Sequence, residues 1–171
     1  PGGSIGSELC RQIAPVGPTR LILVSPGATP LFDIERELVD ERDFTAAAPK
    51  LVDVRNRAAF RREVFEKYKP TVVFHAAAYK HVPLMETHPL ESVRNNVVGT
   101  RITAELSAEF GVERFVLIST DKAVNPKTVM GQSKALCEWV IESLGHRRDV
   151  QTRFVAVRFG NVLNSSGSVI P

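Results

Sequence analysis

The sequence has few aromatic residues, few cysteines and no long hydrophobic run. Phe, Trp and Tyr together make up 7% of the 171 residues, which argues against a surface that stacks nucleic-acid bases. The two cysteines, Cys10 and Cys137, lie far apart in the chain, so we expect free buried thiols and a reducing compartment rather than a disulfide framework. The longest apolar runs, such as 21–24 and 115–118, are far too short to span a bilayer.

An excess of charge of one sign is also missing. The 22 Lys and Arg residues against 19 Asp and Glu residues leave a net charge of +3, and the surplus is scattered along the chain. Such a balance is typical of an ordinary solvated surface, so no nucleic-acid partner is predicted. The hydrophobic content of 43% and the charged content of 24% are those of a globular protein, and the length indicates one domain over residues 1–171.

Short apolar runs alternate with amphipathic segments of helix length. The runs have the continuous hydrophobicity of strands covered on both faces, at residues 21–24, 51–54, 72–77, 115–119 and 154–158. The amphipathic segments predict helices over residues 4–13, 30–40, 58–68, 89–110 and 127–144. Asn56 is a good helix N-cap and Gly111 a good helix stop. This alternation predicts an α/β fold with a Rossmann-like, doubly wound parallel sheet that binds its ligand along the carboxyl edge.

The two ends of the sequence indicate part of a longer protein. Gly2 and Gly3 open the chain within what reads as the middle of a motif, and Pro171 closes it without a terminal element. We therefore expect a fragment of a catalytic domain, in which the first strand of the sheet and the C-terminal substrate-binding part are missing.

Three segments carry residues suited to binding a ligand. The glycines at 2, 3 and 6 would let a backbone turn approach a pyrophosphate at a helix N-terminus, although a plain glycine-rich cap explains them as well. Asp53, at the end of a predicted strand, suits either an adenine amino group or a turn. The three alanines at 76–78 would let a flat ligand lie against the backbone, and Lys80 and His81 follow them; His81 alone could equally be a loop residue.

Two asparagines and an acid–base pair stand at positions that need an explanation. Asn95 and Asn96 fall within a predicted helix, so either they have polar partners or they are tolerated on the surface.

Asp121 and Lys122 follow a predicted strand and could move protons if their pKa values shift toward neutrality. A surface ion pair is the alternative. Further on, a methionine and a lysine at 130 and 134 share one helix face, where core packing would also explain the methionine.

Taken together, these segments resemble the extended short-chain dehydrogenase/reductase superfamily. The resemblance is greatest to its CapD-like polysaccharide-biosynthesis branch, the UDP-N-acetylglucosamine 4,6-dehydratases. It is carried by residues 2–9, 75–85, 95–100, 115–134 and 158–171, about half of the chain. The stretches His-Ala-Ala-Ala-Tyr-Lys-His-Val-Pro-Leu-Met-Glu and Ser-Thr-Asp-Lys-Ala-Val-Asn-Pro are specific to that branch.

The resemblance implies an NAD- or NADP-dependent dehydratase of a UDP-N-acetylhexosamine, in particular UDP-N-acetylglucosamine, that serves surface-glycan synthesis. The sugar is oxidised at C4, the resulting ketone acidifies the C5 proton, water leaves across C5–C6, and the hydride returns to C6. A C5-epimerising dehydratase and a non-catalytic dinucleotide-binding module are the alternatives. The resemblance also implies a homo-oligomer in the cytoplasm, touching a membrane only through a segment that would precede this sequence.

The resemblance also assigns roles to residues by position. The cofactor would be held by Gly2, Gly3, Ser4, Ile5, Gly6, Asp53, Val54, Ala76, Ala77, Ala78, Lys80, Asn96, Ser119 and Lys134. The UDP-sugar would contact Lys80, His81, Thr120 and Asn161. The catalytic set would be Thr120, Asp121, Lys122, Met130 and Lys134, without a metal. Among these, Asp121 would protonate the departing 6-hydroxyl, Lys122 would take the C5 proton, and Lys134 would bind the nicotinamide ribose.

Several positions depart from the superfamily pattern. Met130 stands where a catalytic tyrosine is usual, so the 4-hydroxyl proton needs another acceptor: Lys122, Asp121 or a water held by Thr120. Ser25 stands where an acid often binds the adenine ribose, which leaves the choice between NAD and NADP open. Asn164 replaces an expected glycine.

Overall fold

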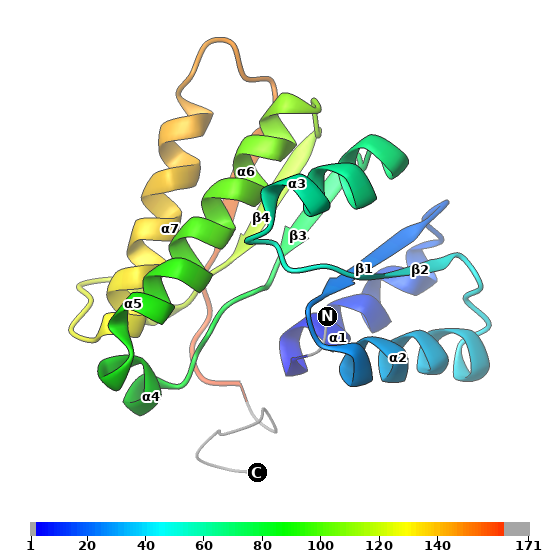
Figure 1. Ribbon diagram of the computed structural model, residues 1–171, viewed down its shortest axis with the longest axis horizontal. Helices are drawn as coiled ribbons and strands as arrows, with labels where there is room; N and C mark the ends of the chain where they lie inside the picture. The colour runs from blue at the N-terminus through cyan, green and yellow to red at the C-terminus, as the bar shows by residue number, and fades with distance from the viewer. Residues whose placement is uncertain (1–2, 163–171) are drawn as a thin grey trace.

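The structure, a computed structural model, describes residues 3–162, and its strands form two parallel sheets (Figure 1). In the smaller sheet, β1 (Leu21–Ser25) pairs with β2 (Ala47–Leu51). In the larger sheet, β4 (Arg114–Ile118) lies between β3 (Val72–His75) and β5 (Arg153–Val157). The predicted parallel α/β architecture is confirmed.

Helices connect the strands much as the sequence predicted. They are α1 (Ser4–Ile13), α2 (Ala28–Arg36), α3 (Arg57–Phe60), α4 (Val82–Thr87), α5 (Pro89–Ser92), α6 (Gly99–Glu109) and α7 (Val129–Gly145). Wider π-type turns, η2 (Glu37–Glu41) and η3 (Arg61–Glu66), continue α2 and α3, and η4 (Val93–Val98) joins α5 to α6. Short 3₁₀ turns are η1 (Ala14–Val16) and η5 (Asp121–Ala123). Helix α4 was not predicted.

One predicted strand was misplaced, and another was predicted two residues too long. β2 ends at Leu51, where the sequence predicted a strand to begin, and Asp53 follows in a turn. Its residues pair one by one with β1, from Leu21 with Ala47 to Ser25 with Leu51. The alanine, proline and lysine of β2 carry a weak strand signal, and a proline is tolerated because β2 pairs on one side only within the described residues. The run predicted at 72–77 ends as a strand at His75.

Alternating residues of β1 face opposite layers of helices. Leu23 packs with buried residues of α1 and α2. Ile22 and Val24 pack on the other side, against a cluster formed by α3, η3 and α6. Val73 of β3 touches the same cluster, so the two sheets share one core. The smaller sheet is therefore covered on both faces, as a doubly wound fold requires.

The larger sheet is covered by α6 and α7 on one face (Figure 1). Phe115 and Leu117 of β4 are fully buried there. Val116 of β4 is paired in register with Phe74 of β3 and Val155 of β5, so these three residues lie on the opposite face. On that face Phe74 and Val155 are 43% and 42% exposed. Because β3, β4 and β5 run parallel, the loops that follow them meet at one edge, where the residues singled out by the sequence are found.

Candidate active site

The loops after β4 and β5 are joined at the carboxyl edge of the larger sheet. The backbone N–H of Asp121 donates to the carbonyl of Phe159 at 3.1 Å. The Nζ of Lys122 donates to Oδ1 of Asn161 at 2.9 Å. The structure therefore brings together an acid, an amine and an amide that lie up to 40 positions apart in the sequence.

Thr120, Asp121 and Lys122 form a local network. The Oγ1 of Thr120 accepts from the backbone N–H of Lys122 at 3.3 Å and donates to Oδ1 of Asp121 at 2.9 Å. The Nζ of Lys122 lies 3.4 Å from the same carboxylate oxygen. The hydrogen bond from Thr120, followed by that from Lys122, lowers the pKa of the exposed Asp121 carboxyl group. As it stands, Asp121 is an ionised group, and it could act as an acid only after a ligand had displaced the surrounding water.

Met130 and Lys134 lie one helical turn apart on α7, and both are buried. The Nζ of Lys134 donates to the carbonyl of Ile118 at the end of β4, at 2.6 Å. Burial lowers the pKa of Lys134. The lysine therefore reaches the same strand end as the acid–base pair, with the methionine beside it on the helix.

A buried carboxylate that sequence reasoning missed stands behind this edge. Glu138 of α7 accepts a hydrogen bond from Oγ of Ser119 at 2.5 Å. The Nε and Nη2 of Arg158 reach both oxygens of the same carboxylate, at 2.5–3.1 Å. The Ser119 hydroxyl is thus engaged by Glu138 in this structure. The signal available in the sequence was the position of Glu138, four residues after Lys134 on the buried helix face.

Asn96 supports the loop after β3. It is fully buried within η4, where its Oδ1 accepts from the backbone N–H of Tyr79 at 2.7 Å. Its Nδ2 donates to the carbonyl of Tyr79 at 3.1 Å and to Oγ of Ser133 at 2.9 Å. The polar partners expected for Asn96 are confirmed, and tolerated surface polarity is wrong for this residue. The two hydrogen bonds between Asn96 and the backbone of Tyr79 hold the loop that contains the three alanines at 76–78.

The alanine loop leads into exposed basic residues. Ala76 and Ala78 are half-buried and Ala77 is exposed. Lys80 and His81 are exposed, and His81 is the residue before α4. Both basic side chains therefore face outward next to the small residues, where they could meet an anionic ligand.

The N-terminus of α1 suits an anion. Gly3 precedes this ten-residue helix with an extended backbone, and within the described residues no side chain caps it there. The space around Gly3 is open, since a Cβ atom at this position would have no neighbour within 4 Å among the described residues. Ser4, Ile5 and Gly6 form the first turn. Backbone N–H groups at such a terminus can bind phosphate. Gly2 and Asn164 lie outside the described residues.

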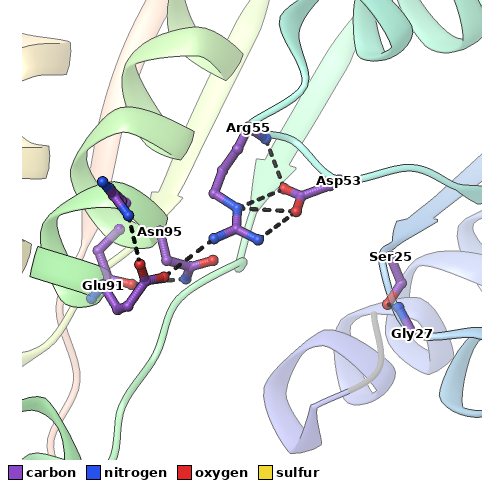
Figure 2. A network of polar contacts seen from close by, with 8 residues as sticks. Ser25, Gly27, Asp53, Arg55, Glu91 and Asn95 are labelled. Atoms are coloured by element: carbon purple, nitrogen blue, oxygen red, sulfur yellow. Dashed lines mark hydrogen bonds and ion pairs between the residues drawn. The ribbon is translucent and has the colours of Figure 1, made fainter. Parts of the chain in front are cut away.

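Asp53 is held by an arginine two residues later. Its carboxylate accepts from Nε of Arg55 at 3.0 Å and from Nη2 at 2.6 Å, and also from the Arg55 backbone N–H at 2.9 Å. Figure 2 shows the arginine between Asp53 and Glu91 of α5, whose carboxylate is 3.6 Å away. The hydrogen bonds from Arg55 lower the pKa of Asp53. Asp53 therefore has the contacts expected of a turn residue. An adenine amino group could bind the Asp53 carboxylate only alongside Arg55.

Two further residues near this turn have clear places. Val54 is half-buried and packs against the core cluster beneath the smaller sheet. Ser25, at the end of β1, accepts from the backbone N–H of Gly27 at 3.2 Å and so closes the turn into α2 (Figure 2). A neutral hydroxyl therefore occupies the strand end where the superfamily often has an acid.

The cysteines are both free and buried, as expected. Within residues 3–162, no three His, Cys, Asp or Glu side chains lie together in a way that could hold a metal ion. None of the helices in the same range is both long enough and apolar enough to cross a bilayer.

The whole chain resembles known proteins of polysaccharide synthesis. The family described as polysaccharide biosynthesis protein matches residues 1–171. The capsular polysaccharide biosynthesis protein CapD of Staphylococcus aureus is 50% identical over 171 residues, which are 99% of this chain and 28% of that protein. The UDP-N-acetylglucosamine 4,6-dehydratase (inverting) of Campylobacter jejuni is 39% identical over 100 residues, 58% of this chain and 30% of that enzyme. The chain spans less than a third of either relative.

Solved structures share the fold. Pen from Bacillus thuringiensis superposes with a TM-score of 0.89 at 28% identity, over 98% of this chain and 52% of that one. WbmG of Bordetella bronchiseptica, in complex with NAD and UDP, superposes with a TM-score of 0.74 at 22% identity, over 92% of this chain and 50% of that one. The predicted Rossmann-like fold is confirmed, and the chain spans about half of each of these structures.

Proposed function

Since the chain belongs to the polysaccharide biosynthesis protein family, we propose that it forms the cofactor-binding and catalytic part of a nucleotide-sugar 4,6-dehydratase. The substrate is a UDP-N-acetylhexosamine, in particular UDP-N-acetylglucosamine. The observation that carries the proposal is the group of Asp121, Lys122 and Asn161 at the carboxyl edge of the larger sheet. An elimination needs an acid and a base in that arrangement, and a protein that only binds a dinucleotide does not.

The described residues fit NAD or NADP. The residues that would hold the pyrophosphate are Gly3 through Gly6 at the N-terminus of α1. The three alanines at 76–78 would leave a flat ring room against the backbone, and Lys134, whose Nζ reaches the carbonyl of Ile118, would bind the nicotinamide ribose. When bound, the cofactor supplies reversible hydride transfer to and from the sugar.

The protein's own side chains manage the protons. Lys122 would accept the C5 proton, because its exposed amine, which lies beside Asn161, can reach a ligand. Asp121 gives a proton to the departing 6-hydroxyl once the bound sugar has excluded water and raised its pKa. Met130 does not titrate, so the 4-hydroxyl proton goes to Lys122, to Asp121 or to a water on Thr120.

Replacement of Lys122 tests the proposal. In the full-length protein, Lys122→Ala should lower solvent deuterium exchange at C5 and product formation by about 10²-fold or more, while cofactor binding persists. The matched control is Lys127→Ala, because Lys127 is an exposed lysine at the end of the same loop. Normal C5 exchange in Lys122→Ala would remove the residue from this role.

Inversion at C5 is the second candidate outcome. It is favoured by the Campylobacter jejuni relative, which is described as an inverting 4,6-dehydratase. The same acid and base serve either outcome, which differs only in the face on which C5 is reprotonated. The C5 configuration of the 4-keto-6-deoxy product, read from its NMR coupling constants, decides between them. An intact protein that binds cofactor but forms no product would support the non-catalytic module instead.

A homo-oligomer would form through the outer face of α6 and α7. Leu136 and Trp139 of α7 are 38% and 64% exposed and line an apolar groove between the two helices. Arg101 and Glu105 of α6 border this groove and pair with each other at 3.6 Å, so they form a polar rim beside the apolar side chains. The free buried thiols of Cys10 and Cys137 support a reducing compartment such as the cytoplasm.

A further inference from the structure

The buried carboxylate of Glu138 connects α7 to the ends of two strands. Its side chain is 11% exposed. On one side it accepts from Oγ of Ser119, directly after β4. On the other it accepts from Nε and Nη2 of Arg158, directly after β5. A charged group held on both oxygens by a planar guanidinium has little freedom, because the two parallel hydrogen bonds fix direction as well as distance.

The same segment after β5 reaches the proposed base. Three residues beyond Arg158, the Oδ1 of Asn161 accepts from Nζ of Lys122 at 2.9 Å. Between them, the carbonyl of Phe159 accepts from the backbone N–H of Asp121 at 3.1 Å. The Asp121 carboxylate also lies close to this segment, because a Cβ atom on Gly160 would stand 3.5 Å from its Oδ2.

We propose that Glu138 is a positioning residue for the acid–base pair, acting through Arg158. By holding Arg158, it sets the path of residues 158–161 and thereby the place of the Asn161 amide that meets Lys122. It does not touch the reacting atoms. The inference rests on the proposed function, because positioning matters only if Lys122 takes part in a reaction.

The negative charge on Glu138 is what holds the guanidinium of Arg158 in place. Burial by itself would raise the pKa of this carboxyl group, but the hydrogen bonds from Arg158 and Ser119 hold it below its ordinary value. Glu138 is therefore ionised at neutral pH. A glutamine of the same shape would keep the packing and could not pair with the guanidinium as an ion pair, so Arg158 would be free to turn toward solvent.

The test uses Glu138→Gln in the full-length protein. Misplacement of a proton-transfer group by about 1 Å commonly costs on the order of 10²-fold, so we expect kcat to fall 10- to 100-fold while KM stays within about threefold. The control is Glu142→Gln, one turn further along α7 and exposed, which should leave kcat unchanged. Arg158→Gln should lower kcat to the same degree, and the double variant should be no worse than either single one. A normal kcat in Glu138→Gln, or additive effects in the double variant, would overturn the proposal.

Two measurements keep the test independent of folding and of turnover. If Glu138→Gln does not fold, Arg158→Lys keeps the charge and loses the paired hydrogen bonds, and it should show the same fall in kcat. If the parent protein has no turnover, the proposed function fails, and hydrogen exchange still tests the contact. Faster exchange of the Asp121 amide in Glu138→Gln than in Glu142→Gln would support the connection from Glu138 to residues 158–161, and equal rates would refute the proposal.

Discussion

The backbone carbonyl oxygen of Lys122 lies 2.5 Å from the point where a Cβ atom on Gly131 would stand. Side-chain atoms of Thr128 and Pro126 lie 3.2 and 3.3 Å from the same point. Cβ atoms do not approach a carbonyl that closely, and a carbonyl in the main chain cannot rotate away as a side chain can. Gly131 therefore lets the first turn of α7 pack directly against the loop that carries the proposed acid and base, Asp121 and Lys122.

Substitution of Gly131 by alanine should displace that loop. Alanine is the better helix former by about 1 kcal/mol, so propensity alone predicts stabilisation. We expect the clash to prevail, with a net loss of about 1–3 kcal/mol in the free energy of unfolding. A loop shift of about 1 Å should also lower kcat by on the order of 10²-fold. Chemical denaturation and steady-state kinetics of the full-length protein measure both effects.

Gly145→Ala is the matched control. It lies at the other end of α7, and a Cβ atom there would meet Phe154 at 3.8 Å, an ordinary contact. This variant should match or exceed the stability of the parent and keep its activity. Equal behaviour of the two alanine variants would show that the close approach at Gly131 has no consequence.

The sequence predicted most of the fold because its signals are local. The apolar runs near β1, β3, β4 and β5 and the amphipathic periodicity of α1 and α7 survive in the structure almost unchanged. Strand β2 was misplaced because its alanines and proline carry little strand signal, and its position depends on register with β1. Helix α4 was missed because its six residues begin with a Val-Pro pair that reads as a loop.

The sequence predicted the candidate site only where the residues concerned are neighbours in the chain. Asp121 and Lys122 are adjacent, so the pair could be recognised before the structure was known. The contacts of Lys122 with Asn161 and of Asn96 with Tyr79 join distant segments, and no local pattern encodes them. Glu138 was overlooked for the same reason, since its partners follow two different strands.

His75 should make the protein sensitive to mild acid. It is buried at the end of β3, with Nε2 3.0 Å from Oγ1 of Thr100. Burial, and then the charge of Lys134, lowers its pKa from 6.5 to about 3. His75 in the unfolded chain therefore binds a proton below about pH 6.5. In the folded protein the same imidazole binds a proton only near pH 3. Stability from this group is complete above pH 6.5 and declines as the pH falls through that window.

His75→Asn should flatten this dependence. Thermal unfolding between pH 7 and pH 5, above the range in which most carboxylates titrate, should show a smaller decrease in Tm for the variant than for the parent. The variant should also be less stable at pH 7, because a packed imidazole is lost. His146→Asn is the control, since His146 is exposed after α7 and should leave the slope unchanged. An unchanged slope in His75→Asn would contradict the expectation.

Trp139 should dominate the proposed contact between copies. It is 64% exposed on α7, and a large aromatic side chain at the centre of an interface often contributes 2 kcal/mol or more, about 30-fold in the dissociation constant. Trp139→Ser in the full-length protein should therefore shift the oligomer toward monomer in light scattering coupled to size exclusion. Phe32→Ser is the control, because Phe32 is 59% exposed on α2, away from the groove. Loss of the oligomer in the control, or its retention in Trp139→Ser, would exclude the α6–α7 face.

Met130 should not be a decayed catalytic tyrosine. It is 5% exposed, its backbone carbonyl accepts a hydrogen bond from Oγ of Ser133 at 2.7 Å, and Lys134 lies one turn further on the same helix. A tyrosine would add bulk and a hydroxyl to this packed position, and overpacking of that kind commonly costs about 1–3 kcal/mol. Because the proposed acid and base are both present, we expect the full-length parent to be active and Met130→Tyr to give at most a few-fold gain. Steady-state formation of the 4-keto-6-deoxy product measures both proteins. Met130→Phe separates the effect of bulk from that of the phenol, because it has the ring without the hydroxyl. An inactive parent restored by tyrosine and not by phenylalanine would show that the proton acceptor for the 4-hydroxyl has been lost from this site.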